Sequence, residues 1–320
     1  MRLALPPSSK SFPAALLAIA LLPALASAQS APEGLVVFGD SLSDPGNVWL
    51  LTSEVVKAPY GPVPARPYAI GGHHFSNGKT WVELLAQDIG LDAAAKPAMA
   101  NPAHFTNYAF GGARARAGNG SLTPSSAQQV GLYLMDGGGT AQAGALHVLA
   151  FGGNDLRDAL VVAQGDPGAA MLIVSDAVST LLGDIEVLYA AGARRFLVAN
   201  APDLSKAPAV IASGGAAAAE FFATVFNDML EDGLLALEAG PAYADIELLR
   251  LDMFFVLGDM VANPGDYGIV DPYVPCLSFF VKSGAKCDDA DGRLFWDGIH
   301  PTTTGHRGLA DSARTILGLP

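Results

Sequence analysis

Short runs of consecutive apolar residues recur along the chain, and between them lie longer segments in which apolar residues repeat at helical spacing. Unbroken apolar runs rich in β-branched and aromatic residues are typical of parallel strands that are buried on both faces. Runs of this kind predict strands at residues 35–38, 147–151 and 195–200, and two segments of mixed polarity, residues 106–109 and 244–251, are predicted to be strands as well. Helices are predicted at residues 81–89, 124–135, 167–190, 216–238, 253–261 and 303–317. The alternation of strand and helix predicts an α/β protein whose parallel sheet is covered on both faces.

Two long segments follow neither pattern. Residues 49–75 are rich in proline and glycine and are expected to form an ordered loop, and residues 263–293 are expected to form a second loop. No internal repeat and no low-complexity linker divides the rest of the sequence. We therefore expect residues 29–320 to fold as a single domain.

The N-terminus has the pattern of an export signal. Arg2 and Lys10 precede an uncharged, largely apolar run over residues 12–28, which ends in Ala26-Ser27-Ala28. This arrangement predicts a secretory signal peptide at residues 1–28, cleaved after Ala28. A retained membrane anchor is the alternative, but two prolines and the small-residue end favour cleavage. No later apolar run is long enough to span a membrane, so we expect a secreted or periplasmic protein without a stable membrane span.

Net charge bears on the partners of the protein. The formal net charge is −13, and loss of Arg2 and Lys10 with the signal peptide changes it to −15. No cluster of lysine and arginine interrupts this acidic balance. A strongly acidic surface argues against nucleic acids and anionic membrane surfaces as partners.

The sequence contains two cysteines, Cys276 and Cys287, in a loop region rich in glycine, aspartate and proline. In an exported protein, two cysteines at this spacing predict a disulfide that stabilises a local loop by roughly 2 to 4 kcal/mol. Two free buried thiols are the weaker alternative. A metal site is weaker still, because no histidine lies between the two cysteines.

The first predicted strand runs directly into Gly39-Asp40-Ser41, which turns the chain out of the sheet. Ser41 is thereby expected at the carboxyl end of a parallel strand, where α/β proteins carry their chemistry. A serine in such a turn is more often a cap or a turn former. Three further motifs elsewhere in the chain favour a catalytic role instead.

Two predicted strands end in glycine-containing motifs like that of the first, and the C-terminal part of the chain supplies a fourth motif. The four motifs are Gly39-Asp40-Ser41-Leu42, Asn107-Tyr108-Ala109-Phe110-Gly111-Gly112-Ala113, Gly152-Gly153-Asn154-Asp155 and Asp297-Gly298-Ile299-His300. In type and order they resemble the four blocks of the GDSL family, also called SGNH hydrolases. The resemblance spans about residues 33–317. It implies the SGNH hydrolase fold, a flavodoxin-like three-layer sandwich with five parallel strands in the order 2-1-3-4-5.

The chemistry of the motifs can be argued from the residues themselves. A serine hydroxyl is a poor nucleophile at neutral pH and needs a neutral imidazole to accept its proton, and that imidazole needs a carboxylate to hold its tautomer. Asp297 and His300 are three residues apart, so one helical or 3₁₀ turn brings the carboxylate beside the ring. Sequence predicts this pair, with Ser41, as a catalytic triad.

A developing oxyanion also needs hydrogen-bond donors that are fixed in advance, each worth roughly 3 to 4 kcal/mol. The family resemblance implies three such donors: the backbone N–H groups of Ser41 and Gly112 and the side-chain amide of Asn154. Gly111 competes with Gly112, and the spacing of the family motif favours Gly112. Asp40 belongs to the first motif, but a bond that stabilises the turn is its expected role.

Several other classes of site are disfavoured. The remaining histidines are scattered without metal-ligand spacing, so neither a catalytic metal nor a cofactor is expected. Gly78-Lys79-Thr80 resembles the end of a phosphate-binding loop, but five residues separate Gly78 from the preceding Gly72, whereas the loop requires four. In the nucleophile elbow of α/β-hydrolases, a glycine stands two residues after the nucleophilic serine. Ser43 occupies that position after Ser41, so Ser41 does not lie in such an elbow.

The resemblance implies hydrolysis of carboxylic esters, with short- to medium-chain acyl or acetyl esters of a small molecule, glycan or lipid as substrates. A lipolytic phospholipase or acyltransferase of the same family is the alternative, and a non-catalytic exported binding module is an alternative of another class. Aromatic residues of the 49–75 segment, with Tyr267, Tyr273, Phe279 and Phe280, could line an acyl or alcohol pocket or simply shield the core.

Overall fold

A computed structural model describes residue 1 and residues 31–52, 73–117, 122–277 and 287–319 of the chain. The predicted signal peptide at residues 1–28 lies outside the described residues. So do most of the predicted 49–75 loop and both Phe279 and Phe280.

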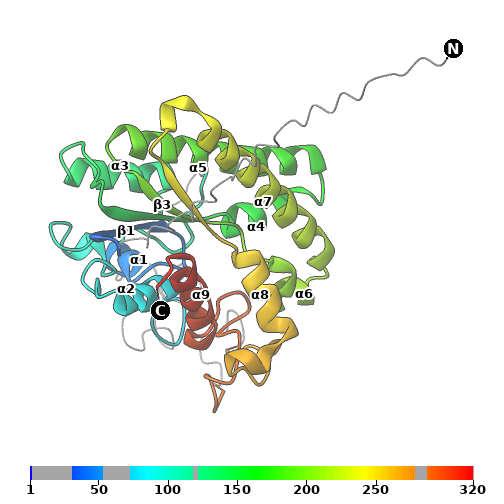
Figure 1. Ribbon diagram of the computed structural model, residues 1–320. Helices are drawn as coiled ribbons and strands as arrows, with labels where there is room; N and C mark the ends of the chain where they lie inside the picture. Colours follow the sequence, from blue (N-terminus) through cyan, green and yellow to red (C-terminus); the bar gives the residue numbers. More distant parts are fainter. Residues whose placement is uncertain (2–30, 53–72, 118–121, 278–286, 320) are drawn as a thin grey trace.

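Among the described residues, the sheet has four parallel strands in the order β1-β2-β3-β4 (Figure 1). Their bounds are Gly34–Gly39 for β1, Ala145–Ala150 for β2, Arg195–Ala199 for β3 and Glu247–Leu251 for β4. Every residue of β2 and β3 is buried, as expected for strands covered on both faces. The predicted fifth strand began too early, because a 3₁₀ turn at Pro241–Tyr243 precedes β4 and Ile246 N–H bonds back to Tyr243 O at 3.0 Å.

The prediction of five strands is wrong at residues 106–109. This segment runs parallel to β1 along its open side, and Val37 exchanges two backbone hydrogen bonds with it, of 2.9 and 2.7 Å. Beyond Val37, Gly39 N–H donates to Oε1 of Gln129 at 2.9 Å instead of to the segment, although Phe110 N–H still donates to Gly39 O at 3.1 Å. A side chain thus takes one position of the ladder, and the segment pairs with β1 only through an isolated bridge. The predicted neighbour of β1 is nevertheless correct, as is the order of the remaining strands.

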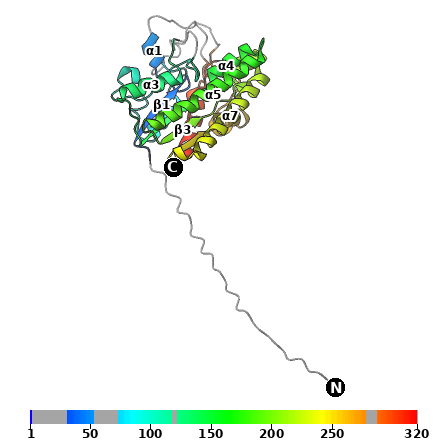
Figure 2. The same cartoon turned by 90° about the horizontal axis from the view of Figure 1, so that it is seen from above.

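Two layers of helices cover the sheet (Figures 1 and 2). One layer contains α3 (Ser126–Asp136), α4 (Gly153–Val162), α5 (Pro167–Ala190) and α7 (Ala216–Ala239). The other contains α2 (Trp81–Asp88), α8 (Met253–Ala262) and α9 (Thr303–Ile316). The three-layer α/β architecture implied by the resemblance is therefore confirmed.

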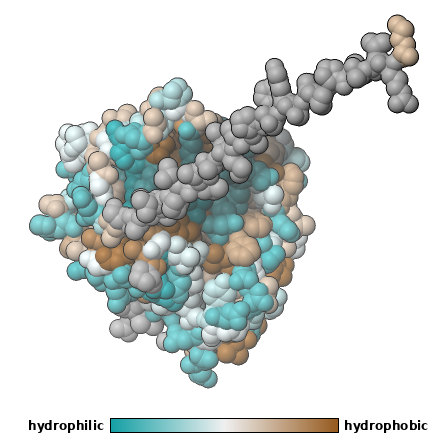
Figure 3. Space-filling view, viewed as in Figure 1, coloured by the Kyte–Doolittle hydropathy of each residue, from teal (hydrophilic) through white to brown (hydrophobic). Residues whose placement is uncertain are grey.

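The six predicted helices are present, with bounds shifted by at most two residues. The predicted start of α3 at Pro124 is wrong, because Ser125 caps this helix in a capping box with Gln128. Three shorter α-helices were not predicted: α1 (Asn47–Thr52), α4 and α6 (Pro208–Ala212). Short 3₁₀ helices, also not predicted, lie at Ala98–Ala100, Leu204–Lys206, Pro241–Tyr243 and Pro264–Tyr267. On the face seen in Figure 3, hydrophobic residues form small groups among hydrophilic ones.

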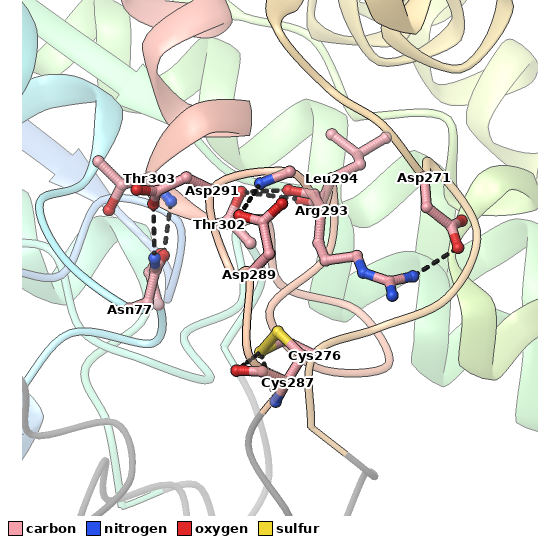
Figure 4. Close-up of a disulfide and its surroundings, with 12 residues drawn as sticks. Asn77, Asp271, Cys276, Cys287, Asp289, Asp291, Arg293, Leu294, Thr302 and Thr303 are labelled. Atoms are coloured by element: carbon pink, nitrogen blue, oxygen red, sulfur yellow. Dashed lines mark hydrogen bonds and ion pairs between the residues drawn. A yellow bond between two sulfur atoms is a disulfide. The ribbon is translucent and has the colours of Figure 1, made fainter.

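Cys276 and Cys287 form the predicted disulfide (Figure 4). Beside it, Cys276 N–H donates to Phe295 O at 3.0 Å, and Leu277 N–H donates to Trp296 O at 2.7 Å. Cys276 and Leu277 therefore lie against the segment that immediately precedes Asp297. A disulfide is compatible with an exported protein.

None of the helices in the described residues has the length and apolar character needed to cross a bilayer.

His306 on α9 is fully buried, at 0% exposure, and within the described part of the chain neither ring nitrogen has a hydrogen-bond partner. Burial, with a smaller effect of the nearby His300 and His74, lowers the pKa of His306 from 6.5 to about 3. The native protein thus keeps this imidazole neutral at pH values where the unfolded chain binds a proton.

This difference predicts a specific loss of stability in acid. The contribution of His306 is complete above pH 6.5 and is lost as the pH falls toward 3, because only the unfolded state binds the extra proton in that window. The free energy of unfolding should therefore fall by about 1.4 kcal/mol per pH unit on this account. Urea unfolding of the wild type and of His306→Leu from about pH 7 to about pH 4 measures it.

The difference in the free energy of unfolding between the wild type and His306→Leu should change by about 1.4 kcal/mol per pH unit, because His306→Leu removes the titrating group. Leu309 lies on the same helix, is buried and does not titrate, so Leu309→Ala provides the matched control and should differ from the wild type by an amount that does not vary with pH. A pH-independent difference for His306→Leu would contradict the prediction.

Candidate active site

Ser41 lies in a tight turn at the carboxyl end of β1. Asp40 forms the turn: its Oδ1 accepts the N–H of Leu42 at 3.0 Å and its backbone oxygen accepts the N–H of Ser43 at 3.1 Å. Burial raises the pKa of Asp40 to about 6, although the hydrogen bond from Leu42 and the charge of His300 oppose the shift. The bond with Leu42 is the turn-stabilising role expected for Asp40.

Asp297 and His300 form a second turn, just before α9. Oδ1 of Asp297 accepts the N–H groups of Ile299 and His300, both at 2.8 Å, and Oδ2 lies 2.7 Å from Nδ1 of His300. Burial alone would raise the pKa of Asp297, but the charge of His300 and these hydrogen bonds outweigh it and hold the pKa below its ordinary value. The carboxylate therefore stays ionised beside the ring.

The two turns meet at the edge of the sheet. Nε2 of His300 lies 2.9 Å from Oγ of Ser41, although 259 residues separate them in the sequence. Ser41 and His300 keep small exposed fractions, 9% and 8%, whereas Asp297 is fully buried. Hydroxyl, imidazole and carboxylate thus form one connected chain of hydrogen bonds whose outer end is accessible.

Two backbone N–H groups near Ser41 are available as donors. Within the described residues, neither the N–H of Ser41 nor that of Gly112 has a hydrogen-bond partner. Gly112 has a φ of 77°, a conformation that favours glycine. The competing Gly111 differs, because its N–H donates to Oδ2 of Asp44 at 2.7 Å. The geometry therefore favours Gly112 over Gly111 as an oxyanion donor.

Asn154 lies in the first turn of α4, directly after β2. Gly152, with a φ of 118°, allows the sharp transition, and a side chain at this position would also collide with Phe226. Nδ2 of Asn154 donates to Ala113 O at 2.9 Å and makes a long bond of 3.5 Å to Asp40. Its second N–H is therefore held only weakly, and a bound oxyanion would compete with a poor acceptor.

Arg157 fixes the orientation of the Asn154 amide. Its Nη1 donates to Oδ1 of Asn154 at 3.3 Å. Since arginine is a donor only, this contact turns the amide oxygen away and leaves Nδ2 on the side of Ala113 and Asp40. Sequence reasoning missed Arg157, and the only signal was its position one helical turn after Asn154.

Asp44 was also missed, and it joins the first motif to the second. Its carboxylate accepts the N–H groups of Gly46, Asn47 and Gly111 at 2.7, 2.6 and 2.7 Å. Burial raises the pKa of Asp44 to about 6 despite these bonds. The sequence Asp44-Pro45-Gly46 signals a turn, but the contact with Gly111 depends on the fold.

Phe75 packs against both halves of the site. Its ring centroid lies 5.2 Å from that of His300. Gly111 leaves room for the same ring, since a side chain there would come within 2.1 Å of it. Phe75 therefore buttresses the imidazole and the glycine turn together.

His147 in β2 is buried, with Nε2 at 3.3 Å from the hydroxyl of Tyr133, and burial lowers its pKa to about 4. Nowhere in the described residues do three or more His, Cys, Asp or Glu side chains cluster in a way that could hold a metal ion.

This arrangement can perform one kind of chemistry directly. A hydroxyl is hydrogen-bonded to an imidazole that a buried carboxylate orients, and the adjoining turns hold two N–H groups that have no partner among the described residues. These are the groups required for attack on an acyl carbon through a covalent intermediate with a stabilised oxyanion.

Comparison with known proteins points the same way. The family model described as GDSL-like Lipase/Acylhydrolase matches residues 35–313. An uncharacterized protein of Pseudomonas putida, from the trpE–trpG intergenic region, is 28% identical over 334 residues, which cover 97% of this chain and 52% of that protein. The chain thus spans about half the length of that relative.

A GDSL esterase/lipase of Arabidopsis thaliana is 27% identical over 320 residues, which cover 86% of this chain and 88% of the plant protein. Among solved structures, an alpha/beta hydrolase enzyme from the metagenome of Lake Arreo, Spain, matches with a TM-score of 0.48 and 14% identity. That match covers 91% of this chain and 98% of the other.

Proposed function

The chain belongs to the GDSL-like lipase/acylhydrolase family and is an ester-bond hydrolase, and we propose that it cleaves carboxylic esters through an acyl-serine intermediate on Ser41. The observation that carries this proposal is the hydrogen-bonded chain from Ser41 through His300 to Asp297, with distances of 2.9 and 2.7 Å. A non-catalytic binding module would have no use for such a relay.

In the first half of the reaction, Oγ of Ser41 attacks the ester carbonyl carbon while Nε2 of His300 takes the hydroxyl proton. The oxyanion accepts hydrogen bonds from the N–H groups of Ser41 and Gly112 and from Nδ2 of Asn154. The tetrahedral intermediate collapses, its bond to the alcohol oxygen breaks, and His300 returns the proton to the departing alcohol. Asp297 keeps the imidazole in the productive tautomer throughout.

In the second half, water replaces the alcohol. His300 takes a proton from the water as its oxygen attacks the acyl carbon, and the bond to Oγ of Ser41 then breaks. The proton returns to Ser41 and a free carboxylic acid leaves. One ester and one water therefore give one acid and one alcohol, and the enzyme is regenerated without a cofactor.

Small-molecule esters are the substrates that membership of the family favours. The net charge of −13 supports the further proposal that nucleic acids are not partners. The disulfide and the N-terminal pattern of residues 1–28 support export to the periplasm or the medium.

A panel of esters tests the proposal. We expect the purified protein to release p-nitrophenol from p-nitrophenyl acetate and butanoate, and to act on phosphatidylcholine dispersions more slowly. Acetylated xylan in the same panel reports on glycan esters. Fast cleavage of lipid with slow cleavage of short esters would favour the lipolytic alternative, and no cleavage of any ester would favour a binding module.

A further inference from the structure

The turn that carries the Gly112 N–H has little apolar surface to hold it in place. Residues 111–117 read Gly-Gly-Ala-Arg-Ala-Arg-Ala, so every side chain except those of the two arginines is a methyl group or a hydrogen atom. The two consecutive glycines also give the backbone wide conformational freedom. A hydrogen-bond donor to an oxyanion is most effective when its position is fixed before the reaction. Polar contacts are therefore needed to fix this turn, and Arg114 and Arg116 make several of them.

Asp158, one helical turn after Asn154 on α4, pairs with both arginines. Its Oδ2 accepts Nε–H of Arg114 at 2.6 Å, and its Oδ1 accepts Nη2–H of the same guanidinium at 2.9 Å. Arg116 donates to the same carboxylate through Nη2. A bidentate pair of this kind fixes orientation as well as distance. Arg114 is thereby held against α4, and its Nη1 donates to Gly112 O at 3.2 Å.

Asp155 makes further contacts from the same helix. It is fully buried, its Oδ2 accepts the N–H of Ala115 at 2.8 Å, and its Oδ1 lies 3.3 Å from Nε of Arg116. Asn154, the residue before it, donates to Ala113 O at 2.9 Å. The helix that carries the Asn154 amide therefore contacts the glycine turn along most of its length.

We propose that Arg114 and Asp158 are positioning residues, which hold the Gly112 N–H and the Asn154 amide at a fixed separation in the oxyanion hole. The inference rests on the proposed esterase function. The two donors belong to different elements, the glycine turn and α4. The pair of Arg114 and Asp158 is a direct charged link between these elements.

Contacts on either side fix the peptide group that would donate to the oxyanion. In the peptide group before it, Gly111 N–H donates to Asp44, and in the one after it, Gly112 O accepts from Arg114. Loss of the Asp158 carboxylate would release Arg114 and weaken the second of these contacts. The donor N–H would then point less accurately at the oxyanion. Misalignment of such a donor lowers the rate of the chemical step without preventing substrate binding.

Asp158→Asn tests the inference, because it removes the charge and keeps the size of the side chain. Both members of the pair are partly exposed, so the variant is expected to fold. We expect kcat for p-nitrophenyl butanoate to fall by roughly tenfold, with KM within about twofold of the wild type.

Butaneboronic acid supplies a second measurement, because its boron bonds to a serine oxygen and the tetrahedral adduct carries the negative charge of an oxyanion. Its inhibition constant should rise by roughly the same tenfold factor in Asp158→Asn. An ion pair with a purely structural role would lower the thermal stability. It would leave kcat and the boronate affinity of the folded enzyme unchanged.

Glu238→Gln is the matched control. Glu238 on α7 forms the same kind of bidentate pair, with Nη1 and Nη2 of Arg250 on β4. The exposed fractions of these two side chains are 30% and 36%, against 28% and 29% for Arg114 and Asp158. Because β4 lies at the opposite edge of the sheet from β1, Glu238→Gln should leave kcat, KM and the boronate affinity unchanged.

Arg114→Lys tests the same pair from the other side and takes the place of Asp158→Asn if that variant does not fold. Lysine keeps the positive charge, but its single ammonium group cannot reproduce the bidentate geometry of the guanidinium. The fall in kcat should therefore be similar. In the double variant, kcat should lie within about twofold of that of Asp158→Asn, because both substitutions break the same link.

Two results would overturn the inference. One is a folded Asp158→Asn enzyme, or in its place a folded Arg114→Lys enzyme, whose kcat stays within about twofold of the wild type. The other is a fall in kcat with an unchanged boronate affinity. Either result leaves the proposed function intact, because the wild type still cleaves esters. Absence of ester cleavage in the wild type would instead contradict the proposed function itself.

Discussion

Ser41→Ala is expected to lower kcat for p-nitrophenyl butanoate by about 10³- to 10⁶-fold while leaving the fold unchanged. The substitution removes the oxygen that would form the acyl-enzyme, and in the part of the chain that the structure describes, Nε2 of His300 contacts no hydroxyl other than that of Ser41, at 2.9 Å. Little stability depends on that oxygen, because the turn around Ser41 is held by Asp40 instead. Steady-state kinetics and circular dichroism of the same preparation measure both effects.

Ser43→Ala is the matched control in the same turn. Oγ of Ser43 accepts the indole N–H of Trp81 at 3.1 Å, and Ser43 is fully buried. Its loss leaves the indole N–H unsatisfied and should cost about 1 to 3 kcal/mol of stability, with kcat of the folded enzyme retained. Near-full kcat in Ser41→Ala would refute the assignment of the nucleophile.

Asp297→Asn should lower kcat by roughly 10⁴-fold with little change in KM. The asparagine Oδ1 can still accept the N–H groups of Ile299 and His300, which Oδ1 of Asp297 accepts at 2.8 Å. Its amide N–H₂ must then face Nδ1 of His300 and donate to it. The ring proton moves to Nε2, so the imidazole cannot accept the proton of Ser41.

Asp271→Asn is the corresponding control in the same part of the chain. Asp271 pairs with Arg293 at 2.5 Å and does not contact His300, so kcat should stay within about twofold of the wild type. An Asp297→Asn enzyme that retained most of its kcat would contradict the role of the carboxylate in orienting the imidazole.

The regular elements followed closely from the sequence wherever one pattern dominated. The apolar runs at residues 35–38 and 195–200 gave β1 and β3, and the pair Asp166-Pro167 marked the start of α5. The segment at residues 106–109, with the sequence Thr-Asn-Tyr-Ala, forms an isolated bridge with β1 and not the predicted strand. Gln129, remote in sequence, occupies one of the hydrogen-bonding positions on Gly39 that a full strand would take. No local pattern reveals such a replacement.

The same distinction holds for the site. Asp297 and His300 are three residues apart, so their contact could be predicted from helical geometry alone. The contact between His300 and Ser41 depends on how α9 packs against the sheet, and sequence could only suggest it through the family resemblance. Asp44 and Arg157 were missed because their importance lies in the partners that the fold brings to them, Gly111 and Asn154.

Covalent labelling with a fluorophosphonate probe tests the central claim most directly, because the probe reacts with a serine only when a neighbouring base activates it. Peptide mapping of the labelled wild-type protein by mass spectrometry should place a single adduct on Ser41, and Ser41→Ala should remain unlabelled. An unmodified Ser41, or an adduct on another residue in a protein that cleaves esters, would contradict the account.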